Sequence, residues 1–177
     1  MTPIDYTQPE RRLRELLNEW LKGFFTGTAH ATPTGNRTFP DVDILFNQAA
    51  MPESAKPQIH LVWTAPALVP RSVGTMTISV PGATTYTGHA NEMTGPWDVQ
   101  VFLRVKDTGD GNRAEHACAN LSDNFAELLR SSEVATLAEN GLTNLHIMSG
   151  PVPMQTAGWR VRFYTLRGTV VYSAPKG

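Results

Sequence analysis

The side chains that could bind a metal ion are scattered along the sequence. The histidines are His30, His60, His89, His116 and His146. None has the i, i+4 spacing that places two imidazoles on one metal ion. Residues 107–112 superficially resemble a calcium loop, but the third and fifth positions are glycine and the twelfth is Cys118, where a bidentate glutamate is needed. We therefore expect no metal site, and we interpret 107–112 as a turn before a helix, with Asp110 or Asn112 as N-cap.

Signatures of catalysis are also missing from the sequence. It contains no Gly-x-Ser-x-Gly, no phosphate-binding glycine loop ending in Lys-Ser/Thr and no dinucleotide fingerprint after a strand. Cys118, the single cysteine, lies on the apolar side of a predicted helix, which favours a buried and unreactive thiol. An enzyme would need a pocket in which His60 or His116 meets a carboxylate. We expect no catalytic residues, no cofactor and no enzymatic activity.

Length and composition bound the class of protein. The chain has 177 residues, which predicts one domain over 1–177. Its 15 lysines and arginines balance 16 acidic residues, so dedicated DNA binding is disfavoured. No apolar run approaches the roughly 20 residues that cross a bilayer, and the N-terminus lacks a secretion signal, so we expect a soluble protein with no membrane partner.

Two segments have the three- and four-residue apolar spacing of amphipathic helices. The first begins at the capping box Thr7-Gln8-Pro9-Glu10, has its apolar positions from Leu13 to Phe24 and is expected to end at Gly27. The second has its apolar positions from Ala114 to Leu129. The alternating stretches 58–64, 97–106, 142–148 and 159–172 predict strands. Between the last two, Gly150-Pro151-Val152-Pro153 predicts a rigid loop. In the last of these strands the apolar phase slips near residues 164–165, for which a β-bulge is the simplest cause.

The remaining segments predict connections. Residues 26–57 contain Pro33, Pro40, Pro52 and Pro57 and are interpreted as a long proline-rich loop, in which 42–46 form either a short strand or an apolar plug. Residues 74–88 predict an extended hairpin arm around a Pro-Gly turn. The candidate inter-subunit residues of this arm are Met76, Ile78, Val80 and Tyr86.

The predicted fold is therefore α+β: a mainly antiparallel sheet with two helices packed on one face and an extended β-hairpin arm. The opposite sheet face would present the candidate functional residues Asp98, Gln100, Arg104, Lys106, Arg160 and Arg162. The simplest interpretation is a solvated polar face. The functional alternative is a subunit interface or the lining of a pore through which DNA passes without sticking.

The order of elements resembles the tail terminator proteins of long-tailed bacteriophages. The similarity lies in the helix from Arg11 to Phe24, the strand from Pro57 to Thr64, and the strand 98–102 followed by Thr108-Gly109-Asp110. It continues in the alanine-rich helix of Ala114, Ala117, Ala119 and Phe125 and in a last strand opened by Gly158-Trp159. It covers about 140 residues as a pattern of elements, without a diagnostic motif.

This resemblance implies a structural protein of the virion tail or neck, made in the host cytoplasm. Copies of the chain would form a ring, commonly a hexamer, that caps the tail tube, stops tail polymerisation and joins the tube to the head-tail connector or stopper. Double-stranded DNA would pass transiently through the lumen, and the family has no catalytic residues. The 74–88 arm is longer than the family pattern requires. Another phage neck or minor tail subunit, or a monomeric protein-binding module, therefore remain alternatives.

Overall fold

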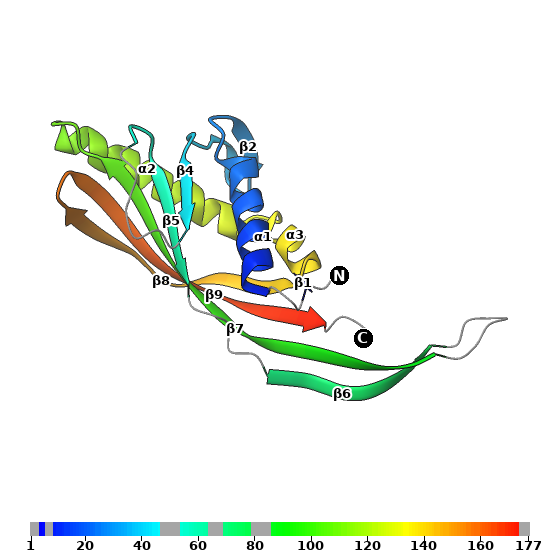
Figure 1. Cartoon of the computed structure of the whole chain (residues 1–177). Coiled ribbons are helices and arrows are strands. Elements are labelled where there is room, and N and C mark those ends of the chain that lie inside the picture. The colour runs from blue at the N-terminus through cyan, green and yellow to red at the C-terminus, as the bar shows by residue number, and fades with distance from the viewer. Residues whose placement is uncertain (1–3, 6–8, 47–53, 64–68, 79–85, 174–177) are drawn as a thin grey trace.

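A computed structural model of the chain describes residues 4–5, 9–46, 54–63, 69–78 and 86–173, with side chains at 11, 13–46, 54–63, 69 and 93–171. These residues form an α+β fold, as predicted (Figure 1). The helices are α1 (Pro9–Phe24), α2 (Gly111–Arg130) and α3 (Val134–Glu139). The strands are β1 (Ile4–Asp5), β2 (Ala29–Thr32), β3 (Gly35–Thr38), β4 (Asp43–Phe46), β5 (Gln58–Trp63), β6 (Val69–Ile78), β7 (Tyr86–Lys106), β8 (Leu142–Thr156) and β9 (Trp159–Ser173).

Strand β7 is the centre of the main sheet. It pairs antiparallel with β9 on one side and with β5 and then β6 on the other, while β8 pairs antiparallel with β9. The short strands β4 and β1 add parallel pairs at the margins, beside β5 and β9. Strands β2 and β3 form a separate hairpin. Among the described residues the sheet is therefore mainly antiparallel, as the sequence predicts.

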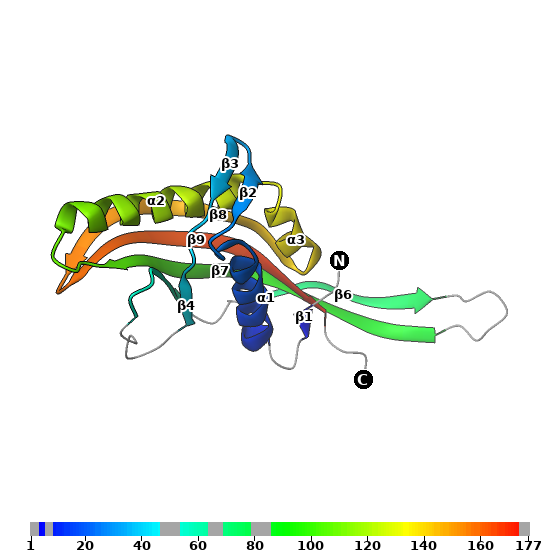
Figure 2. The same cartoon turned by 90° about the horizontal axis from the view of Figure 1, so that it is seen from above.

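All three helices lie on one face of this sheet, which Figure 2 shows from the helix side. We call it the inner face and its reverse the outer face. The odd-numbered side chains of β7 between Trp97 and Leu103 are at most 1% exposed and belong to one core with the apolar sides of α1 and α2. The apolar side chains that alternate along β7 thus pack against the apolar sides of α1 and α2 in a single layer.

The start of α2 agrees with its predicted cap. The side chain of Asp110 accepts a hydrogen bond from the backbone N–H of Arg113 at 3.1 Å, so Asp110 is the N-cap. Further along the helix Cys118 is 0% exposed, and its Sγ donates to the backbone oxygen of Leu103 at 3.6 Å. The helix is therefore fastened to β7 by the side that the sequence assigns to the core.

Three predictions about the strands are wrong. The proline-rich segment 26–57 is not one long loop, because it contains β2, β3 and β4, and the apolar clump 42–46 contributes a strand beside β5. The predicted strand 142–148 and rigid loop 150–153 are a single strand, β8. The ladder between β7 and β9 runs without a shift from Trp159 to Ser173, so β9 has no bulge there. The irregular register belongs to β8, which shifts against β9 in three places.

Strand β6 and the part of β7 paired with it, Tyr86–Thr94, form an extension that we call the ribbon; β9 joins it only at residues 92–94 of β7. Figure 1 shows it reaching away from the helices. The backbone of three predicted arm residues is paired within it: Met76 with Gly88, and Ile78 with Tyr86. Val80 and the predicted Pro81-Gly82 turn lie outside the described residues, so the tip of the predicted arm stays a prediction.

Candidate functional site

The six residues predicted to share one sheet face are divided between its two faces. Asp98, Gln100, Arg104 and Lys106 alternate with the buried odd residues of β7 and therefore lie on the outer face. Arg160 and Arg162 are register partners of Val105 and Leu103, which places both arginines on the inner face with the helices. The predicted single face of six polar residues is thus wrong for its two β9 members.

Each of the two inner arginines has an acidic partner. Nη2 of Arg160 donates to Oδ2 of Asp107 at 3.1 Å, and its Nη1 donates to Oε1 of Gln155 at 2.7 Å. Arg162 donates to Glu115 on the first turns of α2. These charge-assisted bonds hold the start of α2 to the sheet at the end where the apolar core stops. Arg160 and Arg162, whose side chains are 23% and 19% exposed, thus lie on the helix side of the sheet and pair with acidic residues there.

The outer face also carries apolar side chains. Phe102 of β7 and Phe163 of β9 are register partners with ring centroids 4.9 Å apart. Next to Phe163 lies Val152 of β8, which is 46% exposed, and Met154 beside it is 44% exposed. The outer face is therefore neither polar nor fully solvated where β7, β9 and β8 run side by side.

Arg104 completes this region with an aromatic partner. Its guanidinium carbon lies 4.6 Å from the ring centroid of Trp159, a cation–π contact. Burial lowers the pKa of Arg104, which still leaves it charged at neutral pH. Its buried Nη1 has no hydrogen-bond partner. We call the following set the outer patch: Phe102, Arg104, Val152, Met154, Trp159 and Phe163.

The predicted acidic member of the face, Asp98, is already paired. Nε and Nη2 of Arg167 donate to its two carboxylate oxygens, each at 2.7 Å, in a bidentate pair. The Arg167 hydrogen bond lowers the pKa of Asp98 below its ordinary value. Both side chains are more than 40% exposed, so water screens the pair and it adds little to stability. Asp98 therefore does not neutralise Arg104 or Lys106.

His60 joins the margin of the outer patch, and the sequence pattern missed its burial. It is the register partner of Phe102, with ring centroids 6.0 Å apart, and is only 6% exposed. Burial, and then the charge of Arg104, lowers the pKa of His60, so the imidazole is neutral at pH 7. Its Nε2 has no hydrogen-bond partner. The sequence signal for a partly apolar outer face is Phe102 at an even position of β7, together with Val161 and Phe163 at odd positions of β9.

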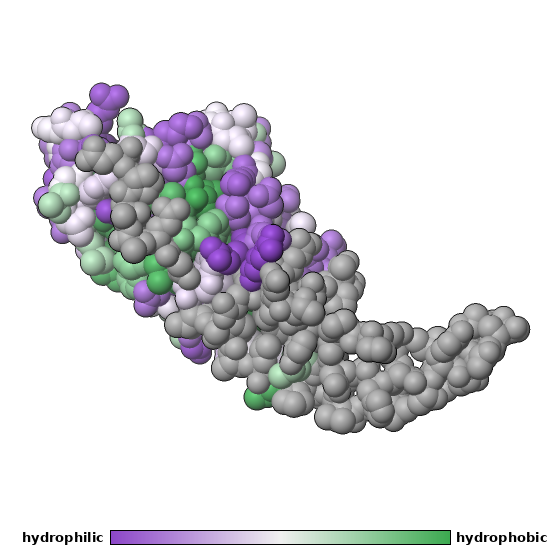
Figure 3. Space-filling model, in the orientation of Figure 1, coloured by the Kyte–Doolittle hydropathy of each residue, from purple (hydrophilic) through white to green (hydrophobic). Residues whose placement is uncertain are grey.

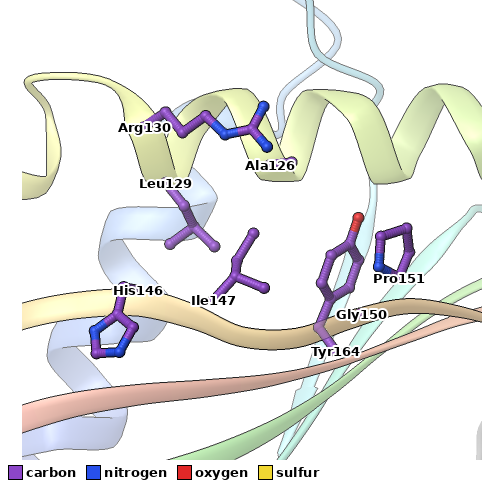
Figure 4. A pocket seen from close by; sticks show the side chains of 8 residues that line it. All are labelled: Ala126, Leu129, Arg130, His146, Ile147, Gly150, Pro151 and Tyr164. Carbon is purple, nitrogen blue, oxygen red and sulfur yellow. The ribbon is translucent and has the colours of Figure 1, made fainter.

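Apart from the outer patch, a hollow of about 360 Å³ lies between α2 and β8 (Figure 4). Its lining is Ala126, Leu129, Arg130, His146, Ile147, Gly150, Pro151 and Tyr164. The hydroxyl of Tyr164 lies 2.5 Å from Oγ of Ser122 and is thus already hydrogen-bonded to α2. The lining contains no carboxylate beside His146 and no nucleophile with a base. Nothing in this hollow corresponds to a catalytic pair.

The rest of the described surface is more ordinary. Figure 3 shows hydrophobic surface over β4 beside the hydrophilic outer side of α1. There Ile44 and Phe46 pack against the core, and Phe46 lies 5.2 Å from the ring of Trp63. Within the described ranges no three metal-ligating side chains come together. None of the helices described is long and apolar enough to cross a membrane.

No protein-family model matches this chain, and no curated protein sequence matches it.

Proposed function

We propose that the chain is a structural virion subunit of a long-tailed bacteriophage that forms a ring on the tail tube. In this role the ring, of six copies, ends tail polymerisation and joins the tube to the head-tail connector while DNA passes through its lumen. The order α1, β5, β7, α2, β9 follows the order of elements in the tail terminator family. This likeness of order supports the proposal without identifying the family.

The observation that carries the proposal is the ribbon. Pairing of β7 with β9 ends at Glu92, opposite Ser173, so among the described residues the ribbon beyond that point has two strands only. Two paired strands alone are marginally stable in water, because neither face is covered. A ribbon of this length is therefore expected to pack on another chain, and a ring of copies supplies such a neighbour at every position.

Sedimentation velocity and negative-stain imaging of the purified protein test the proposal. We expect a ring-sized species that grows with protein concentration, and rings seated on the ends of tubes assembled from the tube protein of the same phage. A uniform monomer that never caps tubes would overturn the proposal and favour the monomeric binding module. A ring that leaves tube ends free would favour a different neck or tail subunit.

A shortened ribbon separates assembly from folding. Because Thr75 pairs with His89, replacing residues 76–88 by Asn-Gly closes the remaining strands with a two-residue turn. We expect this variant to keep the thermal midpoint of the monomeric body but to lose rings. The matched control inserts Asn-Gly in the hairpin turn between Thr32 and Gly35 of β2 and β3, which should leave rings intact. Unfolding of the shortened variant would show that the ribbon belongs to the core.

A further inference from the structure

We propose that the outer patch docks another protein, through a partner surface that presents a carboxylate among apolar side chains. This inference goes beyond ring formation and stands whether or not copies of the chain assemble. It concerns the outer face of the sheet, which is separate from the ribbon.

The first step is the apolar exposure. Four large apolar side chains of the described residues are more than 40% exposed, and two of them, Val152 and Met154, stand side by side on β8 within the outer patch. They continue the apolar surface of Phe163 and Phe102 across β9 and β7. Contiguous exposed apolar surface of this kind marks sites where proteins meet other molecules.

The second step is the direction of approach. Strand β8 is an edge strand, but Pro151 and Pro153 lie on it and have no N–H to offer to a further strand. Proline on an edge blocks pairing with another chain. A partner at the outer patch is therefore expected to approach the face of the sheet and contact side chains, without extending the ladder past β8.

The third step is charge. Arg104 and Lys106 point from the same face of β7 and have no carboxylate partner among the described residues. The guanidinium of Arg104 is held over Trp159, and none of the ion pairs among the described residues involves it. A carboxylate of a partner complements such a guanidinium with charge-assisted bonds. The group that fits the charge of the outer patch is thus an anionic acceptor.

The fourth step excludes a second copy of the chain. A symmetric dimer through the outer patch would bring Arg104 and Lys106 of both copies face to face, which repels. The helical side offers carboxylates without a described cationic partner at Asp123, Glu133 and Glu139. The exposed large apolar residues of the described chain lie on β6 and β8, none on the helices. Among the side chains that the structure describes, no surface combines both features, which favours a different protein as the occupant.

A selection from displayed short random peptides tests the chemistry of this occupant. Peptides are selected on the wild-type protein and counter-selected on the double variant Arg104→Gln, Met154→Gln. We expect enrichment of sequences with Asp or Glu flanked by apolar residues. A basic consensus, a purely apolar consensus, or no enrichment over the double variant would overturn the proposal.

Fluorescence anisotropy of the best labelled peptide then assigns the contacts. We expect Arg104→Gln to weaken binding about tenfold, as the loss of one charge-assisted hydrogen bond does, and Met154→Gln to weaken it severalfold. The matched controls are Arg113→Gln, an exposed arginine on α2, and Met148→Gln, an equally exposed methionine of β8 outside the patch. Equal losses in the controls would refute a site at the outer patch.

Two further measurements complete the test. Circular dichroism checks that each variant is folded. If Met154→Gln changes the sedimentation of the protein alone, the patch is an interface between copies and the proposed occupant is wrong. Loss of rings in the shortened ribbon with unchanged peptide binding would separate this proposal from that of the ring.

Discussion

Replacing Gly168 with alanine probes the packing of β8 over β9. Gly168 is the register partner of Trp97, and a Cβ built on it would lie 2.8 Å from Cδ1 of Leu142 and 3.4 Å from Cδ1 of Leu145. Both leucines are buried, at 0% and 4% exposed. Carbon atoms pack at about 3.5–4.0 Å, so Leu142 has to move by about 1 Å within a filled core.

The expected cost follows from these distances. Forcing a methyl group into a well-packed core costs about 1–3 kcal/mol. Removing a glycine from the interior of a strand returns about 0.5–1 kcal/mol, because the unfolded chain loses freedom. We therefore expect Gly168→Ala to lower the free energy of unfolding by about 1–2 kcal/mol.

Gly23 supplies the matched control for the same chemical change. A Cβ on Gly23 would meet nothing within 4 Å, and the residue lies in the last turn of α1. Gly23→Ala should therefore raise the free energy of unfolding by about 0.5 kcal/mol through helix propensity. The two substitutions are predicted to act with opposite signs.

Urea unfolding followed by tryptophan fluorescence and circular dichroism measures both effects. Each variant is compared with the wild type at equal protein concentration and at two concentrations, because assembly would add to apparent stability. A Gly168→Ala variant as stable as the wild type, with Gly23→Ala stabilised as expected, would refute the packing of Leu142 against β9.

Three other predictions concern titratable and paired groups. Burial raises the pKa of the Cys118 thiol to about 11, so a thiol reagent at pH 8 should modify the protein only after unfolding; rapid labelling of folded protein would contradict it. The pKa of His60 is lowered by burial and by Arg104, so its neutral form stabilises the fold fully above about pH 6.5, and this contribution is lost as the pH falls toward the folded pKa. Between pH 6.5 and 5 the free energy of unfolding of His60→Gln, measured by denaturation, should accordingly fall less than that of the wild type. An equal fall in both proteins would argue against a buried imidazole. A double-mutant cycle of Arg162→Gln and Glu115→Gln should give a coupling of about 1 kcal/mol, because the arginine is 19% exposed and the glutamate 42%; zero coupling would show that this ion pair does not hold α2 to the sheet.

The parts of the fold that the sequence predicts are those in which one face alone is buried. The odd residues of β7 and the apolar stripe of α2 each follow a single period, because each element has one buried side and one exposed side. The N-cap at Asp110 was also predictable, since its carboxylate has a local partner three residues on.

The failures have a common physical cause, which is burial that changes sides along an element. In β9 the residues Val161 and Phe163 are apolar on the outer face, whereas Tyr164 and Leu166 are apolar on the inner face. This exchange of sides produces the same phase slip as a bulge would, although the strand is regular. Arg160 and Arg162 were therefore assigned to the wrong face.

Proline misled the prediction of β8 in a different way. Pro151 and Pro153 favour a rigid loop in the sequence, but on an edge strand proline needs no ladder partner on its free side.

The candidate site is predictable from the sequence only in part. The alternation in β7 correctly places Arg104 and Lys106 on the outer face. Their aromatic and apolar surroundings come from β9 and β8, which no local pattern in β7 can reveal.

Strand β7 also has a mechanical consequence. Its 21 residues run without interruption from Tyr86 in the ribbon to Lys106, a length of about 70 Å at roughly 3.4 Å per residue. Phe102 and Arg104 lie near the C-terminal end of this strand, and the ribbon contains its N-terminal end. A torque applied to the ribbon would therefore be carried along the ladder of β7 and β9 toward the outer patch. If the ribbon and the outer patch bind partners as proposed, a single strand mechanically connects the two contacts.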